Sequence, residues 1–87
     1  MYEKKATIMK PNGLCARPAT FLIQRANEFK SSIWIEKDER RVNAKSLFGV
    51  LSLGVAQGAT ISIIADGSDE VVAVDTLCGL ITSDFAE

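Results

Sequence analysis

The amino-acid sequence predicts an α+β fold, an open-faced sandwich in which three helices cover one face of a four-stranded antiparallel sheet. The chain has 87 residues, which is room for a single domain spanning residues 1–87. Its apolar residues alternate between a period of two and a helical period, in the order β-α-β-β-α-β-α. Because strands outnumber helices, an antiparallel sheet with its helices on one face is the most economical arrangement.

The first strand and the first helix follow from the apolar spacing near the N-terminus. Residues 2–9 alternate with Ala6 and Ile8 on one face, which predicts a half-buried strand. Residues 16–29 then carry apolar side chains at helical spacing. Pro18 is tolerated only in the first turn of a helix, so this helix is expected to begin at residue 15 or 16.

A hairpin and a short helix are expected in the middle of the chain. Residues 32–36 alternate as a second strand, and the polar turn 37–40 leads into a short strand around 41–43. Ser46 stands directly before a short apolar-periodic segment, which predicts a helix with Ser46 as its N-cap.

The last third of the chain predicts a strand and a final helix. Residues 60–66 alternate, with Ile61, Ile63 and Ala65 facing inward. After a turn at residues 66–67, Ser68 or Asp69 is expected to cap a helix. The helix presents one apolar stripe, made of Val71, Val74, Leu77, Cys78 and Ile81.

Composition excludes several classes of function. Ten Lys and Arg against eleven Asp and Glu give a net charge of −1, which predicts no binding to nucleic acid or to a membrane surface. The chain has no histidine, so phosphohistidine chemistry and imidazole-bound metals are excluded. We expect a cytoplasmic protein in which Cys15 and Cys78 are free thiols, with no metal site and no cofactor.

Three segments carry a resemblance to a known family, and the third of them, residues 66–70, resembles the start of that family's final helix. Residues 12–19 read Asn-Gly-Leu-Cys-Ala-Arg-Pro-Ala, which resembles the active-site signature of HPr, the phosphocarrier of the bacterial sugar phosphotransferase system. The family has a phosphorylatable histidine where this chain has Cys15. Residues 43–54 are similar to the family's regulatory-serine segment, with Ser46 at the serine position. The resemblance covers essentially the whole chain and implies four antiparallel strands packed on three helices.

The resemblance also implies partners. In the Gram-positive form of the family a dedicated HPr kinase/phosphorylase modifies the serine, and a LacI-type catabolite regulator binds the protein. Enzyme I and Enzyme IIA are the partners expected of a phosphate carrier. The residues expected to contact partners are Arg17, Thr20, Ser46, Leu47, Phe48 and Leu51.

The sequence allows several interpretations of Cys15, which together with Arg17 occupies the family's phospho-acceptor site. In the leading one the site is silent for phosphotransfer and the protein is regulatory, as in one Gram-positive family member that also lacks the histidine. Alternatively, Cys15 accepts phosphate as a thiophosphate, and the protein is a carrier for sugar transport. As a third interpretation, the helix N-terminus and Arg17 lower the pKa of the Cys15 thiol and make it a redox sensor. An engineered cysteine is a further alternative.

Ser46 carries the more specific prediction. An N-cap serine is most simply structural and contributes about 1 kcal/mol. The similarity of the surrounding segment favours regulatory phosphorylation in carbon catabolite control, by a protein without catalysis of its own. Phe48 is hard to bury in so short a helix and is a candidate for docking, whereas the spacing of Leu47 and Leu51 fits either core or docking surface.

Overall fold

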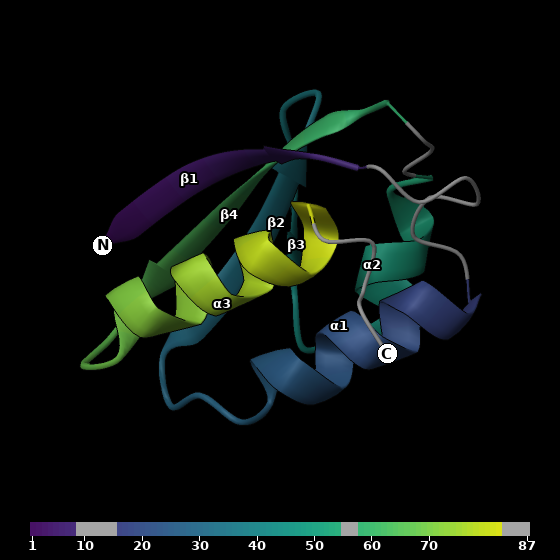
Figure 1. The fold of residues 1–87 in the computed structure, drawn as a ribbon. Helices are drawn as coiled ribbons and strands as arrows, with labels where there is room; N and C mark the ends of the chain where they lie inside the picture. The colour runs from purple at the N-terminus through teal and green to yellow at the C-terminus, as the bar shows by residue number, and fades with distance from the viewer. Residues whose placement is uncertain (9–15, 55–57, 83–87) are drawn as a thin grey trace.

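The computed structural model describes residues 1–8, 16–54 and 58–82, with the backbone alone for residues 16–18. Four antiparallel strands form one sheet in the order β1-β4-β2-β3, and the helices lie on one face of it (Figure 1). The predicted fold class is therefore confirmed. The elements are β1 (Tyr2–Thr7), α1 (Ala16–Ala26), β2 (Ser32–Lys37), β3 (Arg40–Asn43), α2 (Leu47–Ser52), β4 (Thr60–Asp66) and α3 (Glu70–Thr82).

The inner strand β4 buries one face and, at one position, the opposite face as well. Its predicted inward residues are buried in the core beneath the helices, as expected. Ile64 points to the opposite face and is also fully buried, which the alternation did not predict. Its Cα partners are Glu3 on β1 and Trp34 on β2, and cross-strand neighbours of this kind are close enough to cover a side chain between them.

The predicted hairpin is confirmed as the pair β2 and β3. Lys37 pairs with Arg40, which leaves a two-residue loop of Asp38 and Glu39. These two residues have φ values of 51° and 68°, as the tight hairpin turns that match strand twist require. The hairpin therefore keeps its register although neither loop residue is glycine.

Helix α1 is shorter than its apolar spacing predicts and ends at Ala26 rather than near Phe29. The Asn27 backbone N–H and its side-chain Nδ2 both donate to the Ile23 carbonyl, each at 2.9 Å. The next two backbone N–H groups, on Glu28 and Phe29, bond three residues back. These tighter bonds satisfy the last carbonyls and close the helix, so Phe29 packs partly buried from the turn that follows.

Helix α3 confirms most of the predicted stripe, but Val71 does not belong to it. Val71 is 48% exposed, whereas Ala73 is fully buried in its place. At about 100° per residue, Val71 falls at the margin of the buried face, on the same side as the partly accessible Cys78. Residues at that margin reach the edge of the core only.

Candidate functional site

Ser46 caps α2 as the sequence predicts. Its backbone is extended, with φ −110° and ψ 121°, and its Oγ accepts a hydrogen bond from the Gly49 N–H at 3.3 Å. Its carbonyl accepts from the Val50 N–H at 3.0 Å, which starts the helix. The serine side chain thus lies at the first turn of α2 and is only partly buried.

Asn43, at the end of β3, holds the segment that presents Ser46. Its backbone carbonyl accepts from the Ser46 N–H at 3.1 Å, and its side-chain Oδ1 accepts from the Lys45 N–H at 2.8 Å. The second bond is the local turn that Asn side chains make two residues ahead. Sequence reasoning missed this role, although the Asn-x-Lys-Ser pattern after a strand was a usable signal.

Leu47, Phe48 and Leu51 form an exposed apolar surface beside Ser46, with exposed fractions of 42%, 85% and 39%. The alternative that Leu47 and Leu51 belong to the core is therefore wrong. Val50 is fully buried instead, and Leu53 follows it into the core. Because α2 makes fewer than two full turns, it can bury only the one side that faces the sheet and α1, so its three other large apolar side chains stay accessible.

The remaining predicted contact residues lie on or before α1. Helix α1 packs against α2, and Figure 1 shows α2 beside the half of α1 that comes first in the chain. Thr20 is exposed on α1. Arg17 lies in the first turn of α1, but its side chain is outside the described part of the structure, as is the whole of Cys15. The proximity of these two side chains to Ser46 therefore stays a prediction.

Cys78, the other cysteine, lies in the surroundings of a structural residue. Cys78 is a free thiol on α3 and is 9% exposed. Burial raises the pKa of its thiol above the usual 9.0, against a smaller opposing effect of Lys4. A protonated, buried thiol is a poor nucleophile, in keeping with the expectation that Cys78 is an inert core residue.

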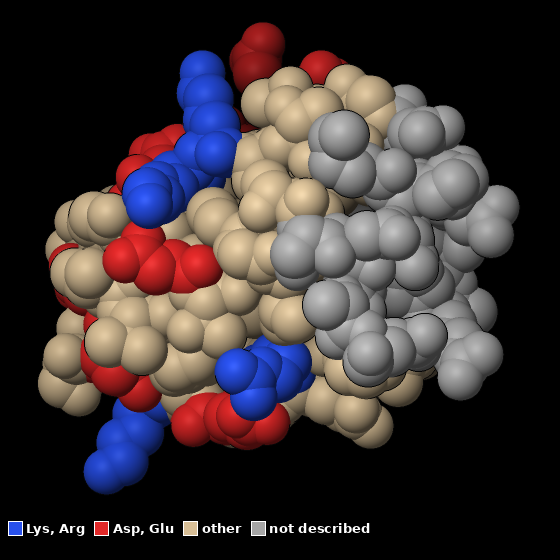
Figure 2. Space-filling model, in the orientation of Figure 1, with Lys and Arg blue, Asp and Glu red and all other residues tan. Residues whose placement is uncertain are grey.

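Charge on the helix-covered face is mixed. Figure 2 shows Lys and Arg side chains interspersed with Asp and Glu over the described part of that face. Within residues 1–8, 16–54 and 58–82, no three Cys, Asp or Glu side chains are grouped so that they could hold a metal ion. No helix in the same ranges is long and apolar enough to cross a membrane.

The fold and this site define a class of small phosphocarrier and regulatory proteins. The profile of the family described as "PTS HPr component phosphorylation site" matches residues 2–83. The chain belongs to the HPr family of the phosphotransferase system. Members of this family are in general phosphate carriers or regulators and not catalysts.

The chain is similar to HPr-like proteins called Crh over nearly its whole length. It is 46% identical to Crh of Halalkalibacterium halodurans over 81 residues, which are 93% of this chain and 96% of that protein. It is 41% identical to Crh of Bacillus subtilis, again over 93% of this chain and 95% of the relative. Among solved structures, HPr-C-His from Thermoanaerobacter tengcongensis superposes with a TM-score of 0.96 at 47% identity, covering 100% of this chain and 98% of the other.

Proposed function

We propose that this protein is a regulatory signal in carbon catabolite control, switched by phosphorylation of Ser46, rather than a phosphate carrier. The observation that carries the proposal is the placement of a partly accessible Ser46 at the start of the short helix α2, which exposes the side chains of Leu47, Phe48 and Leu51. An apolar surface beside a hydroxyl that becomes negatively charged on phosphorylation is a suitable docking site for a partner.

Phosphorylation of Ser46 would change recognition without unfolding the domain. A phosphoryl group adds about 1.5 to 2 negative charges, and here they would lie at the N-terminal end of α2, where backbone N–H groups favour negative charge. The core contact of this helix is made by the fully buried side chain of Val50, one turn further along. The charge therefore appears on the docking surface and leaves the packing of α2 intact.

The partners in this proposal are an HPr kinase/phosphorylase and a LacI-type transcriptional regulator. They would contact Thr20 and Arg17 on α1 together with the apolar residues of α2. Enzyme I and Enzyme IIA are not partners in this scheme. A donor enzyme built to phosphorylate an imidazole meets a shorter nucleophile at Cys15, and a misplacement of about 1 Å can cost roughly 100-fold in rate.

The proposal is tested by incubating the protein with HPr kinase/phosphorylase and ATP, followed by fragment mass spectrometry. The expected result is one phosphate on Ser46, absent in Ser46→Ala. Ser52→Ala is a matched control on the same helix, because the Ser52 hydroxyl also bonds an α2 backbone group, the Gly49 carbonyl at 2.7 Å. A phosphate on another residue, or no phosphate, contradicts the proposal.

A second assay separates the regulator from a carrier that uses Cys15. The protein and Cys15→His are each incubated with Enzyme I and phosphoenolpyruvate. Phosphate is expected on the histidine variant only. Acid-labile phosphate on the Cys15 thiol at a comparable rate would show a carrier instead.

A further inference from the structure

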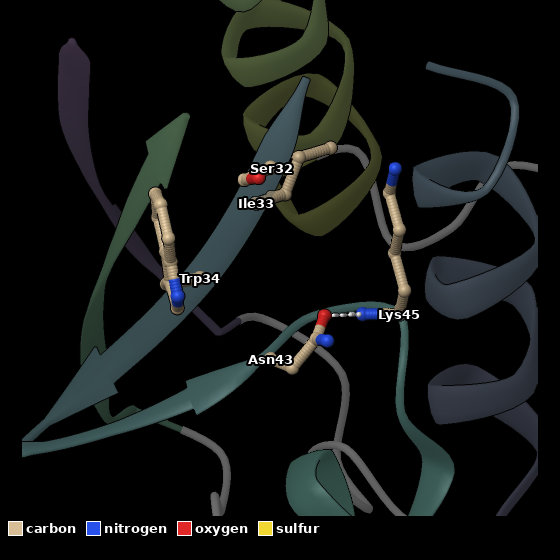
Figure 3. A pocket seen from close by; sticks show the side chains of 5 residues that line it. All are labelled: Ser32, Ile33, Trp34, Asn43 and Lys45. Carbon is tan, nitrogen blue, oxygen red and sulfur yellow. Dashed lines mark hydrogen bonds between the residues drawn. The ribbon is translucent and has the colours of Figure 1, made fainter. Parts of the chain in front are cut away.

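A pocket of about 150 Å³ opens where the pairing of β2 with β3 ends. The last Cα pair of the two strands is Trp34 with Asn43, and one more hydrogen bond, from the Ala44 N–H to the Ile33 carbonyl at 2.9 Å, follows it. The chain then leaves β3 toward α2, away from β2. Figure 3 shows the side chains that line the pocket, and none of them belongs to the docking surface proposed above: Ser32, Ile33, Trp34, Asn43 and Lys45.

The size and one wall of the pocket suit a flat ring. Its volume is close to that of an enclosed cavity that holds benzene, although this pocket is open to solvent and has polar walls. The Trp34 indole supplies an aromatic surface, and the Arg41 guanidinium carbon lies over that ring, 5.9 Å from its centroid. A ring bound in the pocket would meet the indole by its face or by its edge, and both are favourable aromatic contacts.

The polar groups of the pocket are mainly hydrogen-bond donors. The Asn43 Oδ1 already accepts from the Lys45 N–H, as the dashed line in Figure 3 marks, so the amide NH₂ of Asn43 is the part left for a ligand. The exposed Ser32 adds a hydroxyl, and the indole adds an N–H. A ligand that satisfies this lining presents oxygen acceptors.

The charges around the pocket favour an anion. Arg41 is paired with Glu36 at 3.1 Å, and the N-terminal ammonium pairs with Glu70 at 3.1 Å and lies 3.9 Å from Asp66, the Cα partner of Ser32. The Lys45 ammonium instead donates to a neutral carbonyl, that of Phe29, at 2.8 Å. Among the described residues Lys45 has no salt bridge to a carboxylate, so its charge is available to an anionic ligand.

We propose that this pocket binds a small aromatic carboxylate, with its ring against Trp34 and its carboxylate on the NH₂ group of Asn43. Ser32 donates a further hydrogen bond, and the positive charge of Lys45 favours the anion. The inference does not rest on Ser46 phosphorylation, because Ser46 does not line the pocket, although Asn43 lines the pocket and also holds the segment that presents Ser46.

Benzoate is the probe for this proposal, and its binding is followed by amide chemical shifts and by fluorescence of Trp34, the single tryptophan of the chain. Saturable shifts are expected at residues 32–34 and 43–45, with a dissociation constant of about 1 mM, ordinary for a ligand of this size. Benzamide, which has the same ring without the charge, is expected to bind at least about fivefold more weakly. Two outcomes overturn the proposal: shifts centred on other residues, or binding that does not saturate by about 10 mM benzoate.

Asn43→Asp is the decisive variant. Aspartate keeps the oxygen that accepts from the Lys45 N–H but replaces the NH₂ donor with a negatively charged oxygen, so benzoate should bind at least about tenfold more weakly. Asn27→Asp makes the same change in charge at the end of α1 and should leave the affinity unchanged. Ser32→Ala, an exposed position, is expected to weaken binding about threefold and keeps the test decisive if the Asn43 variant does not fold. Unchanged affinity in a folded Asn43→Asp or in Ser32→Ala overturns the proposal.

Discussion

The Asp69 carboxylate accepts hydrogen bonds from both the backbone N–H of Ser31, at 3.0 Å, and the Ser31 hydroxyl. It also accepts from the Lys30 N–H at 2.9 Å. Ser31 is 1% exposed, and Asp69 supplies the acceptor that a buried hydroxyl needs. Because Asp69 directly precedes α3 and Ser31 directly precedes β2, this pair joins the start of the last helix to the sheet.

The first prediction is acid sensitivity centred on this pair. The hydrogen bonds, that from the Ser31 hydroxyl first, hold the pKa of Asp69 below its ordinary value of 3.8. A carboxylate with a lowered pKa in the folded state stabilises the fold above its unfolded pKa, and this stabilisation is lost as pH falls through the folded value. The free energy of unfolding, measured by urea denaturation, should therefore fall below about pH 4.

Asp69→Asn is the control for that prediction. Asparagine does not titrate, so the variant should be less stable at pH 7 and should lose less stability on acidification. Part of the slope will remain, because the Gly67 N–H and the N-terminal ammonium also lower the pKa of Glu70. Parallel stability curves for the two proteins would show that Asp69 is not the group responsible.

Any substitution of Gly67 is predicted to destabilise the fold, because this glycine lies very close to Ser31. A Cβ built at Gly67 lies 2.5 Å from the Ser31 Oγ and 2.7 Å from its Cα. Gly67→Ala should lower the free energy of unfolding by about 1–3 kcal/mol or more, because the backbone of the neighbouring loop must move. Gly79→Ala, in α3 where a Cβ would touch nothing within 4 Å, should instead stabilise the protein by about 0.5–1 kcal/mol. Chemical denaturation of both variants checks the difference, and a neutral Gly67→Ala would contradict the packing described.

Cys78 is predicted to be unreactive in the folded protein. Burial raises the pKa of its thiol above the usual 9.0, so almost no thiolate is present at neutral pH and a reagent reaches it only after opening of the fold. In Cys15→Ser, a thiol reagent should label the native protein at least about 100-fold more slowly than the unfolded protein. Fast labelling of the native variant would be inconsistent with this packing. Because Cys78 is expected not to react, any fast thiol reaction of the unsubstituted chain is assigned to Cys15 and so tests the redox interpretation.

Substitutions at Ser46 and at Phe48 are predicted to have different effects, the first on stability and the second on recognition. Ser46→Ala removes the cap that accepts from Gly49 and should cost about 1 kcal/mol. Phe48 is 85% exposed, so Phe48→Ala should change stability by less than about 0.5 kcal/mol while weakening binding of the phosphorylated protein to the proposed LacI-type regulator. Denaturation and titration calorimetry measure the two effects. A Phe48→Ala protein that binds normally would exclude the apolar surface of α2 as the docking site.

Local patterns in the sequence predicted most of the architecture, because they depend on neighbouring residues. Period-two alternation identified β2 and β4, and the turn residues identified the hairpin. The N-cap position of Ser46 followed from a serine placed directly before apolar residues at helical spacing. The family resemblance pointed to the same seven elements, and the family profile confirms it over residues 2–83.

The contacts that define the sites needed the tertiary structure. Spacing alone left Leu47 and Leu51 with either role, and only the packing of α2 on α1 and the sheet decides that Val50 is buried and they are not. The burial of Ile64 depends on which strands flank β4, and the contact of Asp69 with Ser31 joins residues 38 positions apart. The sequence by itself therefore determined the elements and the candidate switch at Ser46. The tertiary structure decided which side chains of α2 are exposed and that Ile64 is buried on the outer face of β4, because burial there depends on neighbours distant in the chain.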